Sequence, residues 1–121
     1  MRGFHRTALA AVTVVAALTA MSAPTATALP QAAAAPADCP RGYFCGYKNA
    51  NFRNLAFKFR DCYLQEIPDG LNSGGSWYNN QSRGTQARMY NKDKKLIYTT
   101  PGAPSSDASG DWGPVWYVDA C

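Results

Sequence analysis

Apolar and polar residues alternate in short runs after residue 38, and this is the spacing of β-strands. The alternation is clearest over 43–47 and 55–59, where Leu55, Phe57 and Phe59 share a face that we expect to point inward. Further strands are predicted at 86–90, 95–99 and 112–118. No helical period is sustained for three turns, so the pattern predicts an all-β domain of about seven short strands packed as a sandwich.

Clusters of polar residues, glycine and proline separate these runs and predict turns. The predicted turns and loops are 48–51, 67–70, 72–75, 79–84, 91–94 and 101–110. The two halves, 43–77 and 85–118, share a loose plan of strand, turn and strand. Trp77 is expected to fill the core, whereas Trp112, flanked by glycine and proline, is the best candidate for an exposed indole.

Residues 1–28 have the pattern of a secretory signal peptide. A positive N-terminus precedes the apolar segment Ala8 to Ala20, and small residues mark a cleavage site after Ala28, with 34–35 as an alternative site. A transmembrane anchor is the other interpretation, but 13 apolar residues are fewer than the roughly 20 that span a bilayer. We therefore expect a secreted, extracellular protein.

An Ala- and Pro-rich flexible leader is predicted at 29–38, followed by one domain at 39–121. A domain of about 80 residues buries a modest share of its surface, and disulfides often stabilise domains of this size. All four cysteines lie in it, so two disulfides are predicted; zinc-bound thiolates are disfavoured by the lack of a C-x-x-C motif and of a nearby histidine. Without the two arginines of the signal the net charge falls from +4 to +2, which gives no reason to expect nucleic acid or membrane partners, and we expect a monomer.

Three motifs carry a resemblance to a known family: C-P-R-G-Y-F-C-G-Y at 39–47, N-F at 51–52 and S-W-Y-N-N-Q-S at 76–82. With them the sequence resembles the actinobacterial secreted peptidase inhibitors of family I36, relatives of the Streptomyces metalloproteinase inhibitor. The resemblance covers about 39–100 and implies a βγ-crystallin-like fold, a Greek-key β-sandwich. It places core aromatic residues at Tyr47, Phe52, Trp77 and Tyr90.

The sequence departs from the family pattern at two places. Asn54 occupies a position where crystallin-type motifs carry glycine, and asparagine is the next best residue for a positive φ. The characterised inhibitor presents its reactive segment in a second small disulfide loop, which by strand order corresponds to 97–102, where this chain has no cysteine.

The resemblance also supports a bridge between Cys39 and Cys45, one of the three pairings that four cysteines allow. Proximity in sequence favours the same bridge, because neighbouring cysteines meet most often. Cys62 and Cys121 then form the second bridge, which closes a long loop.

The candidate chemistry is sparse, because the only histidine, His5, lies in the predicted signal peptide. Histidine-dependent nucleophilic catalysis and the common zinc sites are thereby excluded from the mature chain. Asp61, Glu66 and Asp69 could form an acid–base pair, but their sequence context is that of surface and turn residues. We expect neither an enzyme nor a cofactor.

Calcium is the remaining metal to consider, because some βγ-crystallins bind it. Two segments match the calcium motif in part, one from Asn72 to Ser76 and one from Asn79. Gly75 and the pair Arg83–Gly84 occupy positions where hydroxyl residues would be needed. No tight calcium site is predicted, a weak one is the alternative, and the asparagines are expected to bond turn backbone.

The resemblance implies a secreted inhibitor of extracellular proteases, above all of metalloproteases of the thermolysin type. A rigid loop would occupy the active-site cleft in the manner of a substrate. Rigidity favours binding because a preformed loop loses little entropy. Tyr98 would enter the specificity pocket and Pro101 would stiffen the chain after it. The candidate inhibitory loop is Ile97, Tyr98, Thr99, Thr100, Pro101 and Gly102. The alternative is a non-inhibitory βγ-crystallin-like module that binds carbohydrate or cell walls or acts on competing microbes.

Overall fold

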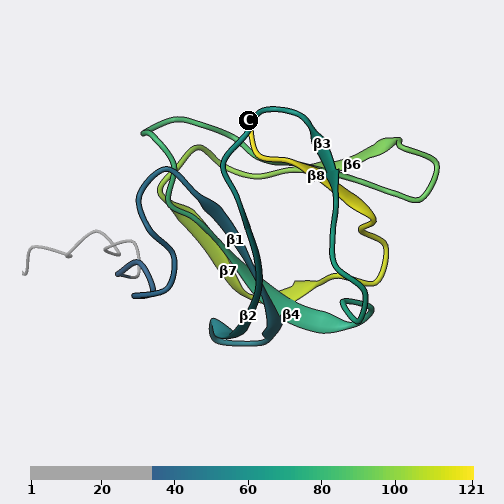
Figure 1. The fold of residues 1–121 in the computed structure, drawn as a ribbon, viewed down its shortest axis with the longest axis horizontal. Coiled ribbons are helices and arrows are strands. Elements are labelled where there is room, and N and C mark those ends of the chain that lie inside the picture. The colour runs from purple at the N-terminus through teal and green to yellow at the C-terminus, as the bar shows by residue number, and fades with distance from the viewer. Residues whose placement is uncertain (1–33) are drawn as a thin grey trace, which may run out of the picture.

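The fold is all-β, as predicted. The computed structural model describes residues 34–121, so the predicted signal peptide and the first part of the leader lie outside the described residues. The eight strands of the described chain are β1 (Phe44–Asn49), β2 (Arg53–Phe59), β3 (Leu64–Glu66), β4 (Gly74–Asn79), β5 (Arg88–Tyr90), β6 (Leu96–Thr99), β7 (Ser105–Asp111) and β8 (Tyr117–Asp119) (Figure 1).

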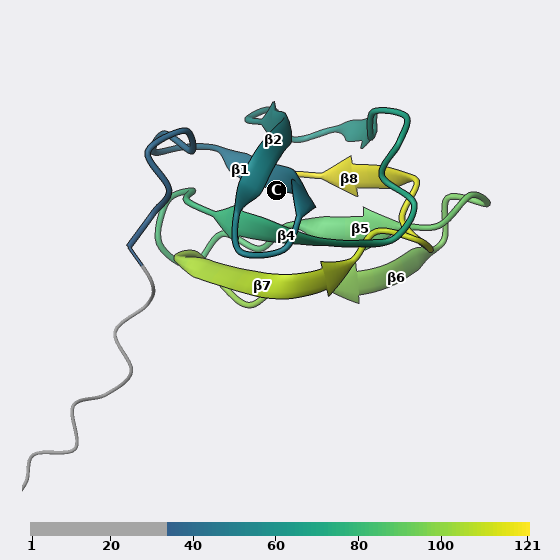
Figure 2. The ribbon, with the colours of Figure 1, turned by 90° about the horizontal axis from the view of Figure 1, so that it is seen from below.

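The strands form two antiparallel four-stranded sheets (Figure 2). Sheet A has the order β2-β1-β4-β7 and sheet B has the order β3-β8-β5-β6. The first half of the chain gives three strands to sheet A and β3 to sheet B, while the second half gives three strands to sheet B and β7 to sheet A. The two halves are therefore interlocked rather than side by side.

The main core lies between the sheets, where alternate residues of β1 and β4 point inward. Phe44 is fully buried, with ring centroids 5.7 Å from Trp77 and 6.2 Å from Phe57. Met89 and Val118 contribute from sheet B. Burial of these large apolar side chains is the main favourable term in the folding of so small a domain.

A second, smaller cluster covers the other face of sheet A. Cys45 and Tyr47 alternate with the inward Phe44 along β1 and are fully buried against Cys39 and Tyr78. Tyr43 and Phe52 pack on this cluster from outside. Sheet A is therefore apolar on both faces, and this explains why β1 has a continuous buried run instead of a simple alternation.

Both disulfides pair as predicted, Cys39 with Cys45 and Cys62 with Cys121. The first pair, with a Cα–Cα distance of 5.9 Å, is buried in the second cluster. The second pair, with a Cα–Cα distance of 4.8 Å, joins residues 59 positions apart. This bridge connects the segment before β3 to Cys121, which lies shortly after the end of β8.

The hairpin between β1 and β2 contains three non-glycine residues with positive φ. Asn54 has φ 58°, which confirms the prediction for this position, and Asn51 and Phe52 have the same value. A bulky residue such as phenylalanine is rare in this conformation. The Ser76 hydroxyl holds the hairpin, because it accepts a hydrogen bond from the Phe52 amide at 2.9 Å and donates one to the Asn49 carbonyl at 2.7 Å.

Two predictions about the C-terminal region were wrong. The segment 101–110 was expected to be a loop, but most of it belongs to β7, which pairs with β4. Its small, mostly polar residues show no apolar alternation, because none of them belongs to the main core. The final strand was expected at 112–118 but covers only Tyr117–Asp119, because a turn precedes it in which the Val115 amide bonds the Trp112 carbonyl and both of these side chains are buried.

The expectation that Trp112 is exposed was also wrong, since this residue is only 2% exposed. Its indole lies over Gly75, where the missing side chain leaves room for the ring. Its Nε1–H donates a hydrogen bond of 2.9 Å to the Tyr47 carbonyl, which satisfies the buried polar group. Trp116 is the exposed tryptophan instead, at 43%.

The predicted inward face of β2 is only partly correct. Phe57 is buried and Phe59 is half-buried, but Leu55 is exposed. The register moves from Gly46 opposite Phe57 to Tyr47 opposite Leu55, so Ala56 forms a bulge. An extra residue in a strand exchanges the faces of the residues on its two sides. Leu55 therefore points away from the main core although Phe57 points into it.

Candidate functional site

The structure divides the candidate segment 97–102 into an exposed strand and a fixed connection. Ile97, Tyr98 and Thr99 belong to β6, the last strand of sheet B. Tyr98 is 44% exposed and Ile97 41%, and the preceding Leu96 is 53% exposed. Three consecutive exposed apolar side chains on a free strand edge are unusual, because such edges invite pairing with another chain.

The second part of the segment is anchored to the domain. Thr100 is fully buried, and its hydroxyl accepts a hydrogen bond of 2.9 Å from the Ala87 amide. Its own amide donates to the Ala87 carbonyl, also at 2.9 Å. Gly102 lies so close to Gly84 that a Cβ at position 102 would be 2.9 Å from the Gly84 Cα. Of 100–102, only Pro101 is exposed.

A β-bulge directs the exposed side chains of β6. Met89 faces Tyr98 and Tyr90 faces Leu96 in the pairing with β5, so Ile97 is the extra residue. A bulge of this kind re-aims a side chain, and here Ile97 and Tyr98 both line the same groove. The Tyr98 ring lies 6.3 Å from the buried Trp77, between centroids, and this contact limits its mobility.

We call this hollow the β6–β7 groove, because residues of both strands form its walls. Its volume is about 300 Å³. The floor consists of apolar core residues, and Asp107 and Asp111 lie on the β7 side. The lining residues are Trp77, Met89, Ile97, Tyr98, Asp107, Gly110, Asp111, Trp112, Pro114 and Val115. This groove could not be predicted from the sequence, because the composition of β7 is that of a loop.

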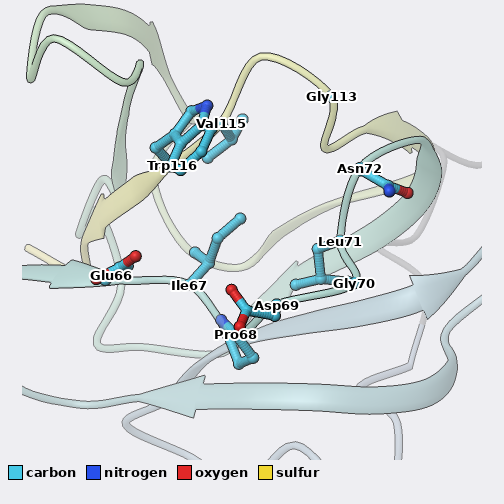
Figure 3. Close-up of a pocket in the computed structure, with 10 residues that line it drawn as sticks. All are labelled: Glu66, Ile67, Pro68, Asp69, Gly70, Leu71, Asn72, Gly113, Val115 and Trp116. Carbon is cyan, nitrogen blue, oxygen red and sulfur yellow. The ribbon is translucent and has the colours of Figure 1, made fainter.

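A second hollow contains two of the three carboxylates considered as an acid–base pair. Glu66 and Asp69 line it, whereas Asp61 does not. Figure 3 shows the side chains of Ile67 and Leu71 directed into the space between them and Trp116. Its volume of about 150 Å³ is smaller than the roughly 300 Å³ at which ordinary ligand pockets begin. This hollow is therefore a poor substrate cleft.

Two of the residues considered for calcium, Ser76 and Asn79, have structural partners. The Ser76 hydroxyl bonds the β1–β2 hairpin, and the Asn79 side chain donates to the Thr85 carbonyl at 2.8 Å and accepts from Gln81. Their oxygens are thus already used within the fold. Among residues 34–121 no three histidine, cysteine or acidic side chains are grouped so that they could hold a metal ion.

An aromatic and basic surface lies near the β5–β6 hairpin. Trp116 is exposed, and the Lys92 Nζ lies 5.6 Å from the centre of its ring. The Lys94 Nζ lies 5.5 Å from the ring of Tyr117 in the same way. Cation–π contacts at exposed sites contribute about 0.5–1 kcal/mol each. The three neighbouring lysines in the sequence were the only available signal for this surface.

Tyr47 connects the end of the predicted leader to the second cluster. Its phenol donates a hydrogen bond of 2.7 Å to the Asp38 carboxylate. Burial raises the pKa of Tyr47 well above its ordinary value of 10.0, and the hydrogen bond and the negative charge of Asp38 raise it further. Pro36 also contacts the domain, through a hydrogen bond from the Cys39 amide.

Two disulfides in so small a domain indicate an oxidising environment of the extracellular type. The part of the chain that the structure describes has no helix that is long and apolar enough to span a membrane. Comparisons with models of known families, with curated proteins and with solved structures found no match to this chain.

Proposed function

We propose that this protein is a secreted inhibitor of extracellular proteases, most of all of metalloproteases of the thermolysin type, and a member of inhibitor family I36. The strand order supports the double Greek key that this family implies, because β4 returns beside β1 and β8 returns beside β5. The protein binds its target without turnover, requires no cofactor and acts as a monomer. An extracellular protease is its partner.

One observation carries the proposal: an exposed apolar run on a free strand edge is followed at once by a buried anchor. Ile97 and Tyr98 are in extended conformation, as a protease substrate must be, and Thr100 fixes the chain directly after them. A preformed segment loses little conformational entropy on binding. The same fixed backbone opposes cleavage, because the segment does not relax away from the catalytic groups.

Titration of the secreted form against a panel of proteases tests this function. The panel contains a thermolysin-like enzyme, a subtilisin and a trypsin, and the protein begins at Leu29 with both disulfides formed. Stoichiometric loss of the thermolysin-like activity alone is the expected result. Inhibition of a serine protease alone would overturn the target class, and no inhibition by a folded, uncleaved protein would overturn the inhibitor proposal.

A binding module for carbohydrate is the second candidate, and exposed Trp116 favours it. Sugars stack on indole rings, and Trp116 is 43% exposed next to Lys92. Retention on insoluble cell-wall polysaccharide, lost on Trp116→Ala, would establish this activity. Equal retention of the variant would show that the indole does not contact sugar.

A further inference from the structure

We propose that the β6–β7 groove binds an extended peptide segment of a partner protein, in which a lysine or arginine lies two positions from an aromatic or large aliphatic residue. The proposal does not depend on protease inhibition. It concerns the hollow between the two sheet edges, and it requires only the groove lining and the two acidic residues of β7.

The floor of the groove accounts for the apolar part of the ligand. Trp77, Met89 and Trp112 belong to the core but also line the groove, and Ile97 and Tyr98 form its β6 wall. A volume of about 300 Å³ is at the small end of the range for ligand sites. The space suits one aromatic or aliphatic side chain with the backbone on either side of it.

The β7 wall accounts for the basic residue. Asp107 Oδ1 accepts a hydrogen bond of 2.9 Å from the Ser109 amide, and Asp111 Oδ1 accepts one of 2.8 Å from the Gly113 amide. These bonds fix both carboxylates at the groove. Within residues 34–121 neither has a lysine or arginine partner, so their charge is uncompensated. Charge complementarity then selects a cationic side chain.

The two strand edges explain why a peptide, rather than a small molecule, fits. β6 is the last strand of sheet B and β7 is the last strand of sheet A, so each has an outer side without a partner strand. Such edges leave alternate backbone N–H and C=O groups available for pairing. An extended peptide supplies matching backbone groups and places alternate side chains in the adjacent hollow.

The test uses the complete secreted form and blocked tetrapeptides, observed by NMR at the indole N–H signals. The probe has the sequence Phe-Ala-Lys-Ala, in which phenylalanine and lysine point to the same side, and its controls replace lysine by glutamate or phenylalanine by serine. We expect the probe to shift the Trp77 and Trp112 signals in a saturable manner and to leave Trp116 unchanged. Each control peptide should bind at least about fivefold more weakly.

Variants locate the charge on the protein side. Asp107→Asn with Asp111→Asn keeps the oxygens that accept backbone hydrogen bonds but removes both charges, and should weaken the probe at least about fivefold. Asp69→Asn with Asp93→Asn removes the same charge from exposed positions outside the groove and should leave the affinity unchanged.

Three results would overturn the proposal. The first is the absence of a saturable shift up to about 1 mM peptide. The second is equal binding of the lysine and glutamate peptides, which needs only the unmodified protein and so remains decisive if a variant fails to fold. The third is a shift confined to Trp116. A negative protease panel combined with a positive peptide titration would reject only the inhibitor function.

Discussion

Gly75 is the residue on which the placement of Trp112 depends. A Cβ at this position would lie 2.5 Å from the Trp112 Nε1 and 2.6 Å from the Tyr47 carbonyl oxygen. Gly75→Ala should therefore displace the indole and weaken its hydrogen bond, which lowers the free energy of unfolding by about 3 kcal/mol. Urea unfolding measures this change. Gly74→Ala is the matched control, because the nearest atom is 3.9 Å away; equal losses in both variants would contradict the packing argument.

Tyr98 is the residue on which the proposed inhibition depends most directly. Tyr98→Thr keeps strand propensity but removes the ring, and we expect the inhibition constant for the target protease to rise at least about tenfold. Tyr63→Thr changes a tyrosine that is 58% exposed and outside β6, and serves as the control. If the first variant inhibits as well as the unmodified protein, the contact surface lies elsewhere.

The phenol of Tyr47 makes the free energy of unfolding vary with pH in the alkaline range. The pKa of its phenol is raised in the folded state above its ordinary value of 10.0. Above that pH the unfolded chain therefore releases a proton that the folded chain retains. This phenol leaves the free energy of unfolding unchanged well below pH 10. As the pH rises further, the free energy of unfolding falls by up to about 1.4 kcal/mol per pH unit. Tyr47→Phe should reduce the decline measured by urea unfolding from pH 9 to 11, whereas Tyr63→Phe should not.

At the scale of elements, the β1–β2 hairpin depends on one hydroxyl from a neighbouring strand. Ser76 in β4 bonds the Phe52 amide and the Asn49 carbonyl of this hairpin. Ser76→Ala leaves both groups without that partner and should lower the free energy of unfolding by about 2 kcal/mol. Ser73→Ala, at an exposed position just before β4, should change it little. A stable Ser76→Ala protein with an unchanged hairpin would show that aromatic packing alone holds the turn.

The elements that could be predicted from the sequence are those with large apolar residues in alternation along the chain. The runs predicted for β1, β2, β5 and β6 overlap the observed strands, whereas the loop predicted at 72–75 was wrong because β4 begins at Gly74. β7 has only small polar residues, because its role is to cover the edge of β4 and not to fill the core. No local pattern distinguishes such a strand from a loop.

Only part of the candidate site could be predicted from the sequence. The position of β6 followed from alternation, but the bulge at Ile97, which points two consecutive side chains into one groove, depends on pairing with β5. The burial of Thr100 depends in turn on its bonds to Ala87. Asp107 and Asp111 line the groove only because β7 is a strand. These features arise from contacts between segments distant in sequence.

At the scale of the molecule, the Cys62–Cys121 bridge restrains the largest part of the chain. It joins residues 59 positions apart, and the chain-entropy model gives about 4 kcal/mol for a loop of this length. Cys62→Ala with Cys121→Ala should therefore lower the free energy of unfolding by about this amount, as measured in urea without reductant. A loss below about 1 kcal/mol would mean that the unfolded chain is already compact.

The exchange of β3 and β7 between the two sheets constrains the order in which the domain can be completed. β3 pairs only with β8, with Leu64 opposite Asp119, so β3 has no partner strand until β8, the last of the eight described strands, has been made. A nascent chain that stops before residue 117 has no strand to receive β3, and Cys62 keeps a reactive thiol because Cys121 is missing. A thiol reagent would thus label Cys62 in chains that stop before Cys121 and would not label it in molecules that have formed the Cys62–Cys121 bridge.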